Sequence, residues 1–415
     1  MRYFCTIFLF LAMLMPWHSV RAQEEGDKGV MEGLSNQFVS NYDSLLNSYV
    51  MRKYATTSQR RNAGSVQSFD QVSDSVLARR LRSLHTVIPM TYNDVVRSYI
   101  RMYLSRMSTR MDVMLTLSEY YHPMFEESLA RYDVPEEIKY LSIVESAMNP
   151  RAVSGRGAVG LWQFIYTTGK NYGLEVNSVV DERRDAYKSS DAAAHYLHDL
   201  HKVFDDWTLA IAAYNCGPGN INKAIARSGG KRDFWEIYPY LPRETRGYIP
   251  AFIAVTYVMN FYPEHGLHPS RATLPLRTDT IMVERNMLFC HISRYTGIDI
   301  EELRTLNPQY RIDLIPGEEG SYPLCLPTGK MNDLIQWADT IFRATEDSLS
   351  RTPVTAAVVR KAASGAPSNS VYHKVRRGET LSMIARKYGT TIKKIKKQNN
   401  LRTDKIREGQ RLRVR

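Results

Sequence analysis

One carboxylate in this sequence lies where a hydrophobic side chain would be expected. In the stretch LSIVESAMNP, residues 141–150, Glu145 shares a helical stripe with Ile138, Leu141 and Met148, because these positions repeat with the 3.6-residue period. A carboxyl group removed from water has its charged form disfavoured, so its pKa rises toward neutrality, as a general acid requires. The alternative is a buried Glu paired with a Lys or Arg, since structural ion pairs also bury carboxylates.

A helix is predicted to position this carboxylate. Pro135 supplies a preset φ at the helix start, and Glu136 and Glu137 favour the positive end of the helix dipole. The pair Asn149-Pro150 then closes the segment. The predicted helix therefore turns Glu145 toward the core.

The composition is that of an ordinary globular protein. The chain has 415 residues, 43% hydrophobic and 24% charged, which is enough for roughly two or three domains. Residues 1–22 are typical of an export signal, with Arg2, an apolar run from Tyr3 to Trp17 and a small-residue cleavage site before Gln23. We expect a mature protein that is soluble outside the cytoplasm, in the periplasm or cell envelope; an uncleaved membrane anchor is the alternative.

The cysteines do not form a disulfide scaffold. After signal cleavage Cys216, Cys290 and Cys325 are left, so at most one internal disulfide can form. Cys290 with Cys325 is the pairing we expect, because both fall in one short segment, although three pairings are possible.

The net charge of +12 is concentrated in the last 44 residues. From Tyr372 to Arg415 there are fifteen Lys and Arg residues and three acidic ones, which accounts for the whole excess. Such a patch binds polyanions. In an exported protein these are cell-wall carboxylates and lipid phosphates, so an anionic envelope surface is an expected partner and nucleic acid is not.

The body of the chain is predicted to be mostly α-helical. Residues 23–70 are polar, with one candidate helix from Met31 to Tyr54. Helical patterns then continue from Asp74 to about residue 262, and Thr91 is a candidate N-cap for the pattern that begins at Tyr92. The segment Ser348–Ser370 is rich in Ser, Ala, Thr and Pro and is predicted to be a flexible linker.

Two segments repeat at an offset of 92 residues, and each is predicted to fold as strand, helix, Gly turn, helix, strand. The repeat matches Phe289, Ile292, Gly297, Ile300, Leu303 and Asn307 with Leu381, Ile384, Gly389, Ile392, Ile395 and Asn399. The second copy resembles a LysM domain through its Gly-Glu-Thr-Leu opening at 378–381, the Tyr388-Gly389 turn and Asn399. The resemblance implies a βααβ module that binds N-acetylglucosamine units. The first copy lacks that opening and is classed as degenerate.

Four motifs surround the carboxylate in the sequence: VESAMNP, SGRGAVGLWQF from residue 154, AAYNCGPGNINKAI from 212 and LPRETRGYIPAF from 241. Together they resemble the catalytic domain of lytic transglycosylases, in particular the membrane-bound lytic murein transglycosylase D type with C-terminal LysM repeats. The implied fold is mostly α, with a lysozyme-like (goose-type, SLT) helical catalytic domain and small α+β LysM modules. The implied site has Glu145 as the only catalytic carboxylate, and the residues lining the groove or supporting the acid are Ser146, Ser154, Gln163, Tyr214, Asn215 and Tyr248.

The implied reaction cleaves the MurNAc-β-1,4-GlcNAc bond of peptidoglycan glycan strands and leaves 1,6-anhydro-MurNAc ends. Glu145 would protonate the leaving oxygen and then, as a carboxylate, take the proton of the sugar's own C6 hydroxyl. Tyr214 fits as the hydroxyl donor that holds the ionised form. Trp162 stands where the family often has Met, and this change is expected to alter how a sugar stacks.

Two other functions are kept as alternatives. A goose-type-lysozyme-like hydrolase on the same fold would recruit Asp181 or Asp185 to hold water, because hydrolases usually place a second carboxylate about 5 to 9 Å from the acid. A non-catalytic peptidoglycan-binding protein would carry a decayed enzyme domain, against which the intact Glu145 argues.

No cofactor and no metal is expected. His195, His198 and His201 are spaced by three and three, so the third rotates away from the face that the first two share. Zinc helices more often use a spacing of four together with a Glu.

The predicted organisation has six parts: a signal peptide at 1–22, an N-terminal helical extension at 23–110, a lysozyme-like transglycosylase domain at 111–266, a degenerate LysM-like domain at 274–330, a helix and flexible linker at 331–371, and a LysM domain at 372–415.

Overall fold

The computed structural model describes residues 69–269, 275, 277–351, 372–376, 378–399, 401, 403–404 and 406–414. The predicted export signal, the candidate helix from Met31 to Tyr54 and most of the predicted linker lie outside the described residues. In the part that is described, no helix is both long and apolar enough to cross a membrane.

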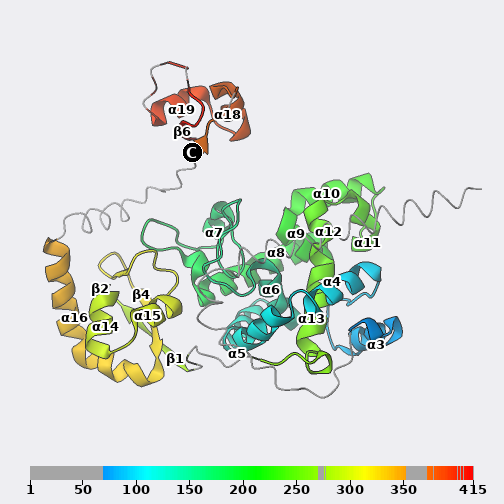
Figure 1. Ribbon diagram of the computed structural model, residues 1–415, viewed down its shortest axis with the longest axis horizontal. Helices are drawn as coiled ribbons and strands as arrows, with labels where there is room; N and C mark the ends of the chain where they lie inside the picture. Colours follow the sequence, from blue (N-terminus) through cyan, green and yellow to red (C-terminus); the bar gives the residue numbers. More distant parts are fainter. Residues whose placement is uncertain are drawn as a thin grey trace, which may run out of the picture.

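A helical body occupies the right of Figure 1 and confirms the mostly α prediction. Its α-helices are α3 (Asp74–Ser83), α4 (Asp94–Leu104), α5 (Ser108–Arg131), α6 (Leu141–Ser146), α7 (Tyr166–Asn171), α8 (Ala186–Phe204), α9 (Trp207–Cys216), α10 (Pro218–Arg227), α11 (Phe234–Ile237), α12 (Arg243–Arg246) and α13 (Tyr248–Asn260). Short 3₁₀ turns are η1 (Phe69–Gln71), η2 (Glu136–Tyr140), η3 (Glu182–Arg184), η4 (Tyr238–Tyr240) and η5 (Pro263–His265).

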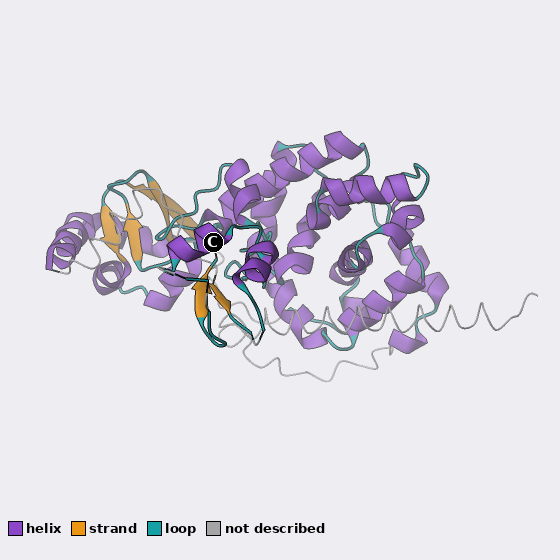
Figure 2. Ribbon diagram, turned by 90° about the horizontal axis from the view of Figure 1, so that it is seen from above, coloured by secondary structure: helices purple, strands orange, loops and turns teal. Residues whose placement is uncertain are grey.

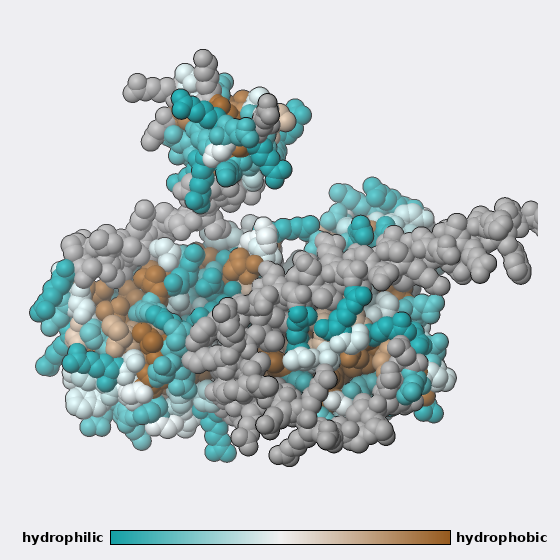
Figure 3. All heavy atoms as spheres, viewed as in Figure 1, coloured by the Kyte–Doolittle hydropathy of each residue, from teal (hydrophilic) through white to brown (hydrophobic). Residues whose placement is uncertain are grey.

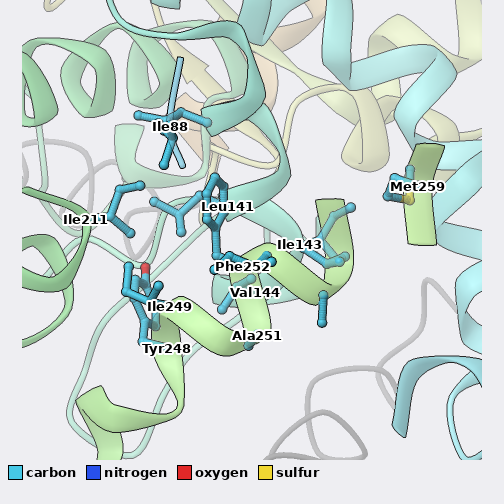
Figure 4. Close-up of a cluster of buried hydrophobic side chains, with 14 of the residues drawn as sticks. Ile88, Leu141, Ile143, Val144, Ile211, Tyr248, Ile249, Ala251, Phe252 and Met259 are labelled. Carbon is cyan, nitrogen blue, oxygen red and sulfur yellow. The ribbon is translucent and has the colours of Figure 1, made fainter. Parts of the chain in front are cut away.

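Helix α13 is the centre of this body. All of its residues except Asn260 are buried, so it is apolar on every side, as a helix in the middle of a core must be. Helices α4, α6 and α9 pack against it. Figure 2, seen from above, shows the surrounding helices arranged as a ring. Inside this ring, apolar side chains of α6 pack against those of α13 (Figure 4).

Polar side chains begin several of these helices. Asn93, Asp185 and Asp206 accept hydrogen bonds from the first free backbone N–H groups of α4, α8 and α9, which satisfies donors that the helix itself leaves unpaired. The N-cap of α4 is therefore Asn93, and the prediction of Thr91 is wrong. Asn93 is the residue whose side chain reaches the amide of Val96, at 3.0 Å.

The predicted helix between Pro135 and Asn149 is present in two pieces. The 3₁₀ turn η2 precedes α6, and Ala147 and Met148 adopt left-handed φ angles of 53° and 55°, which end the helix before Asn149. Ile138, Leu141 and Met148 are fully buried, as the stripe predicts.

A second unit, at the left of Figure 1, contains the first repeat. Its elements are β1 (Thr278–Val283), β2 (Asn286–Leu288), α14 (Phe289–Thr296), α15 (Ile300–Leu306), β3 (Leu314–Pro316), β4 (Tyr322–Pro327), the 3₁₀ turn η6 (Thr328–Lys330) and α16 (Met331–Arg351). Strands β1 and β4 pair antiparallel with Thr278 opposite Pro327, and β2 pairs antiparallel with β3. Leu334 and Ile341 of α16 join the same core, so the packed unit continues beyond residue 330.

A third unit contains the second repeat and has the predicted βααβ order. It consists of β5 (Tyr372–Lys374), α18 (Leu381–Lys387), α19 (Ile392–Gln398) and β6 (Arg411–Arg413), with β5 and β6 antiparallel. Its surface is mostly hydrophilic in the view of Figure 3.

In both repeats, an Asn side chain at the matching position makes the same pair of backbone hydrogen bonds. Asn307 donates to the carbonyl of Cys325 and accepts from its amide, both at 2.8 Å. Asn399 makes the same pair of bonds to Arg413, both at 2.7 Å. Each Asn therefore fixes the end of the second helix to the last strand, which explains the Asn that the sequence repeat aligns.

The expected Cys290–Cys325 disulfide is wrong. Cys216, Cys290 and Cys325 are all free thiols. Cys290 is exposed on α14, whereas Cys325 is partly buried on β4, where burial raises the pKa of its thiol. Nearness in sequence did not bring the two sulfur atoms together, because a helix and a strand present them to different surroundings.

Candidate active site

Glu145 is the only residue from 141 to 150 that is not buried. The residues on both sides of it pack into the core with α13, so the short helix α6 is held in place and Glu145 alone in this segment is partly exposed. The stripe prediction was therefore correct about the packing around Glu145, but the side chain lies at the edge of the core rather than inside it.

The neighbours of Glu145 set its protonation state. Burial raises the pKa of Glu145 to about 7, the hydrogen bond from Tyr248 lowers it, and the nearby carboxylate of Glu244 raises it further. The Tyr248 hydroxyl donates to Oε1 of Glu145 from the first turn of α13. A carboxyl group with a pKa near 7 is partly protonated at neutral pH, so it can give a proton and take one back.

Ser146 supports the acid from inside the protein. It is fully buried, and its hydroxyl donates to the carbonyl of Leu161 at 2.8 Å, with Ser142 O at 3.2 Å as a second acceptor. The bond ties α6 to the loop that follows. Ser146 is therefore placed to fix the backbone beside Glu145, and it does not line an open surface.

Ser154 and Gln163 shape that loop. Ser154 Oγ accepts from the amide of Ala158 at 3.0 Å, and Gln163 Nε2 donates to the carbonyl of Gly160 at 2.9 Å. Gly160 has a φ of 89°, and a Cβ at this position would lie 1.7 Å from the carbonyl oxygen of Arg183. Only glycine fits there, and both polar side chains stabilise the turn around it.

Tyr214 does not bond Glu145 in the predicted manner. Its hydroxyl donates to the carbonyl of Trp162 at 2.7 Å, and the hydrogen bond to the acid comes from Tyr248 instead. Burial raises the pKa of Tyr214, and the charge of Glu145 raises it further. Tyr214 therefore lies close enough to the acid to interact with its charge. Asn215, the next residue, accepts from Thr245 Oγ1 at 2.9 Å and so joins α9 to α12.

Trp162, which was expected to alter how a sugar stacks, presents no face to a sugar, so an effect on stacking stays a prediction. Trp162 is 1% exposed, packs edge-on against Phe125 with ring centroids 5.1 Å apart, and donates from Nε1 to Ser190 Oγ at 2.8 Å. A buried indole with a satisfied N–H is a core residue.

Two residues near the acid were missed from the sequence. Glu244 raises the pKa of Glu145, and it also forms an exposed ion pair with Arg156, with Oε2 3.0 Å from Nη2. Both residues lie within motifs that were already recognised, ETRGY and SGRGAVG, and their charges were the available signal.

The two aspartates proposed for a hydrolase both form hydrogen bonds with structural partners. Asp181 is buried and accepts two hydrogen bonds from Arg183, both at 2.8 Å. Asp185 caps α8 by accepting from the amide of Lys188 at 2.9 Å. Each carboxylate has a structural partner, so neither is placed to hold a water for Glu145.

The three histidines of α8 pack against aromatic rings. His195 stacks on Tyr132 with centroids 4.9 Å apart, His198 is tilted against the same ring at 6.4 Å, and His201 stacks on Trp207 at 4.0 Å. Within the described residues, no group of three or more His, Cys, Asp or Glu side chains could hold a metal ion.

A second candidate site is a pocket of about 580 Å³ on the third unit. Its lining includes His373, Lys374, Arg376, Lys387 and Tyr388. His373 is buried and bridges the Glu379 carboxylate, at 2.6 Å, and the Tyr388 hydroxyl, at 3.0 Å. These hydrogen bonds connect the Gly-Glu-Thr-Leu opening to the Tyr-Gly turn, so the two motif segments are held together beside the pocket.

Comparison with known families finds three matching models. Residues 122–237 match the transglycosylase SLT domain, residues 277–342 match the LysM-like domain of lytic transglycosylase MltD, and residues 373–415 match the LysM domain.

Individual proteins are similar over longer stretches. The membrane-bound lytic murein transglycosylase D of Escherichia coli K12 is 31% identical over 326 residues, which cover 78% of this chain and 69% of that protein. The soluble lytic murein transglycosylase of the same strain is 28% identical over 143 residues, covering 32% and 22%. The crystal structure of the 70 kDa soluble lytic transglycosylase from Escherichia coli aligns with a TM-score of 0.33 and 18% identity, covering 60% of this chain and 45% of that one.

Proposed function

The chain belongs to the lytic murein transglycosylases, of the membrane-bound D type, and on this basis we propose that Glu145 alone carries out both proton transfers of peptidoglycan cleavage. The observation that carries the proposal is its pKa of about 7 beside the Tyr248 hydroxyl. Below that pH the protonated acid donates to the glycosidic oxygen. After donation the carboxylate accepts the proton of the C6 hydroxyl, which attacks C1 and closes the 1,6-anhydro ring.

The other residues position the acid and the strand. Tyr248 stabilises the carboxylate formed after the first transfer, because a hydrogen bond to the charged form favours it. Ser146, Ser154 and Gln163 hold the loop beside the acid, and Tyr214 and Asn215 connect α9 to that loop and to α12.

The LysM units hold the enzyme on its polymer. The third unit keeps the complete motif and a lined pocket, so it is the unit proposed to bind N-acetylglucosamine, and its positive charge favours an anionic envelope surface. The chain is proposed to work outside the cytoplasm, in the periplasm or cell envelope, because its substrate is the wall and residues 1–22 are typical of an export signal.

The products of purified peptidoglycan test this function by mass spectrometry. We expect fragments that end in 1,6-anhydro-MurNAc, lighter by one water than hydrolysis products. Reducing MurNAc ends would instead show that water is the acceptor and that a second group activates it. No release of fragments would favour a wall-binding protein without activity.

A further inference from the structure

Three arginines gather where the helical body meets the second unit. The two parts share backbone hydrogen bonds, from Asp181 N to Gln309 O at 2.8 Å and from Arg311 N to Val179 O at 2.7 Å. Val179 and Val180 also belong to the apolar core of the second unit. The contact is therefore a packed junction. Arg151 and Arg311 both donate hydrogen bonds across it, and Arg184 lies close enough for their charges to act on it, so we call these three residues the junction arginines.

The junction arginines form no ion pair with an acidic side chain among the residues that the structure describes, although the charge of Asp181 acts on Arg184. Arg151 Nη2 donates to the carbonyl of Arg304 at 2.5 Å, and Arg311 Nη1 donates to the carbonyl of Asn177 at 3.0 Å. The Nε atom of Arg184 is buried without a hydrogen-bond partner. A buried donor without a partner is destabilising, so this cluster of guanidinium groups lacks an acceptor.

The guanidinium groups are close enough to affect one another. Burial lowers the pKa of Arg184, and the neighbouring charges of Arg311, Arg151 and Arg183 lower it further, while Asp181 alone raises it. Like charges are rarely held together without an anion to offset them.

The carboxylates around the junction are already occupied. Asp181 binds Arg183, Glu182 binds Lys188, and Asp313 binds Arg304. Glu175 accepts from the Tyr322 hydroxyl and from Asn177 Nδ2. Among the described residues near the junction, Glu175 and Asp185 form no ion pair, and Asp185 is buried as the N-cap of α8, so the three junction arginines outnumber them.

We propose that the junction arginines bind a carboxylate of the peptide attached to the glycan strand. The inference rests on the proposed function, since peptidoglycan is the polymer that offers such carboxylates. Guanidinium groups bind carboxylates through paired, charge-assisted hydrogen bonds, and Arg311, which is exposed, and Arg151, which is partly exposed, present such groups at the junction.

The location connects this site to the acid. Arg151 directly follows the segment that contains Glu145, and the carbonyl of Arg183 contacts Gly160 of the loop beside α6. Because Arg311 comes from the second unit, the anion site exists only when that unit is docked. The degenerate LysM-like unit therefore contributes to substrate recognition through a carboxylate contact, without the sugar-binding motif.

Two variants and a control test the proposal. Arg311→Gln removes an exposed guanidinium whose one side-chain hydrogen bond to the described residues is to a carbonyl. Arg151→Gln removes a partly exposed one, and Arg294→Gln changes an exposed arginine on α14 as the control. The kcat/KM of each full-length protein is measured on intact glycan strands and on strands stripped of peptide by an amidase, with melting temperatures recorded in parallel.

The expected result is a selective loss. Arg311→Gln and Arg151→Gln lose about fivefold to tenfold more activity on peptide-bearing strands than on stripped ones, as for one charge-assisted hydrogen bond. Arg294→Gln leaves the ratio unchanged. Equal losses on both strands would overturn the proposal and show a structural role, and unchanged ratios in both junction variants would overturn it as well.

Direct binding separates this proposal from the proposed function. Titration of the free stem peptide into the native protein should show binding that weakens about fivefold in Arg311→Gln and falls at high salt. If the native protein cleaves neither strand yet binds the peptide through these arginines, the proposed function fails and the anion site stands. Equal affinities of the native protein and Arg311→Gln for the peptide would overturn the proposed anion site, whatever the activity.

Discussion

The hydroxyl of Tyr248 donates a hydrogen bond to Oε1 of Glu145, so the first residue of the central helix α13 holds the one unburied residue of the segment 141–150. The bond lowers the pKa of Glu145, while burial and the charge of Glu244 raise it. The value near 7 is the outcome of these opposing effects, and each of them can be changed separately.

Tyr248→Phe should raise the pKa of Glu145, because the hydrogen bond that favours the carboxylate is lost. The alkaline limb of the pH dependence of kcat/KM should move to higher pH. The maximal rate should fall about tenfold, since the second step needs a stabilised carboxylate. A limb that stays in place in this variant would contradict the assigned bond.

Glu244→Gln should have the opposite effect on the same limb. Removing a neighbouring negative charge lowers the pKa of Glu145, so the alkaline limb should move to lower pH. Because Glu244 is 57% exposed, the rate should change only about twofold, and salt should weaken the shift. Arg156→Gln, which removes the partner of Glu244, is the matched control and should move the limb upward; a shift in the same direction for both would refute the electrostatic explanation.

Glu145→Gln should stabilise the fold at alkaline pH. The folded pKa of about 7 lies above the ordinary value of 4.5, so the folded protein holds this proton more tightly than the unfolded chain. The resulting destabilisation is absent below pH 4.5, grows between pH 4.5 and 7, and is complete above. The free energy of unfolding of the variant should exceed that of the native protein by about 2 kcal/mol at alkaline pH, allowing for partial exposure.

Denaturant titrations at acidic and alkaline pH measure this difference. Glu136→Gln, on the exposed side of the neighbouring 3₁₀ turn, is the control and should show no such pH-dependent gain. The same gain at both pH values would argue that Glu145 does not have a raised pKa.

Trp162→Ala should destabilise the protein by about 3 to 5 kcal/mol, the cost of emptying a large buried site. Trp337→Ala, at a residue 40% exposed on α16, should cost far less. Thermal unfolding compares the two. The milder Trp162→Phe should leave KM within about twofold if the indole is a core residue, and a large increase in KM at an unchanged melting temperature would show that the indole affects sugar binding.

The local patterns of the sequence predicted the elements well. The stripe of Ile138, Leu141 and Met148 is buried, and the second repeat has the βααβ order, because periodicity and turn residues are encoded in neighbouring positions. Membership of the transglycosylase family was likewise confirmed, since its motifs are short and contiguous.

Contacts between distant elements could not be predicted in the same way. The partner of Glu145 lies 103 residues away, and the choice between Tyr214 and Tyr248 depends on how α9 and α13 pack beside α6. The junction arginines come from two units whose docking has no sequence period. Free Cys290 and Cys325 show the same limit, because nearness in the chain does not fix which face a side chain occupies.

The most direct test of the central claim is the yield of 1,6-anhydro-MurNAc ends from purified peptidoglycan, measured by mass spectrometry for the native protein, Glu145→Gln and the exposed control Glu136→Gln. We predict anhydro ends from the native protein and the control, and none above background from Glu145→Gln, while all three bind the polymer equally. Anhydro ends from Glu145→Gln at a rate near that of the native protein would contradict the assignment of both proton transfers to Glu145.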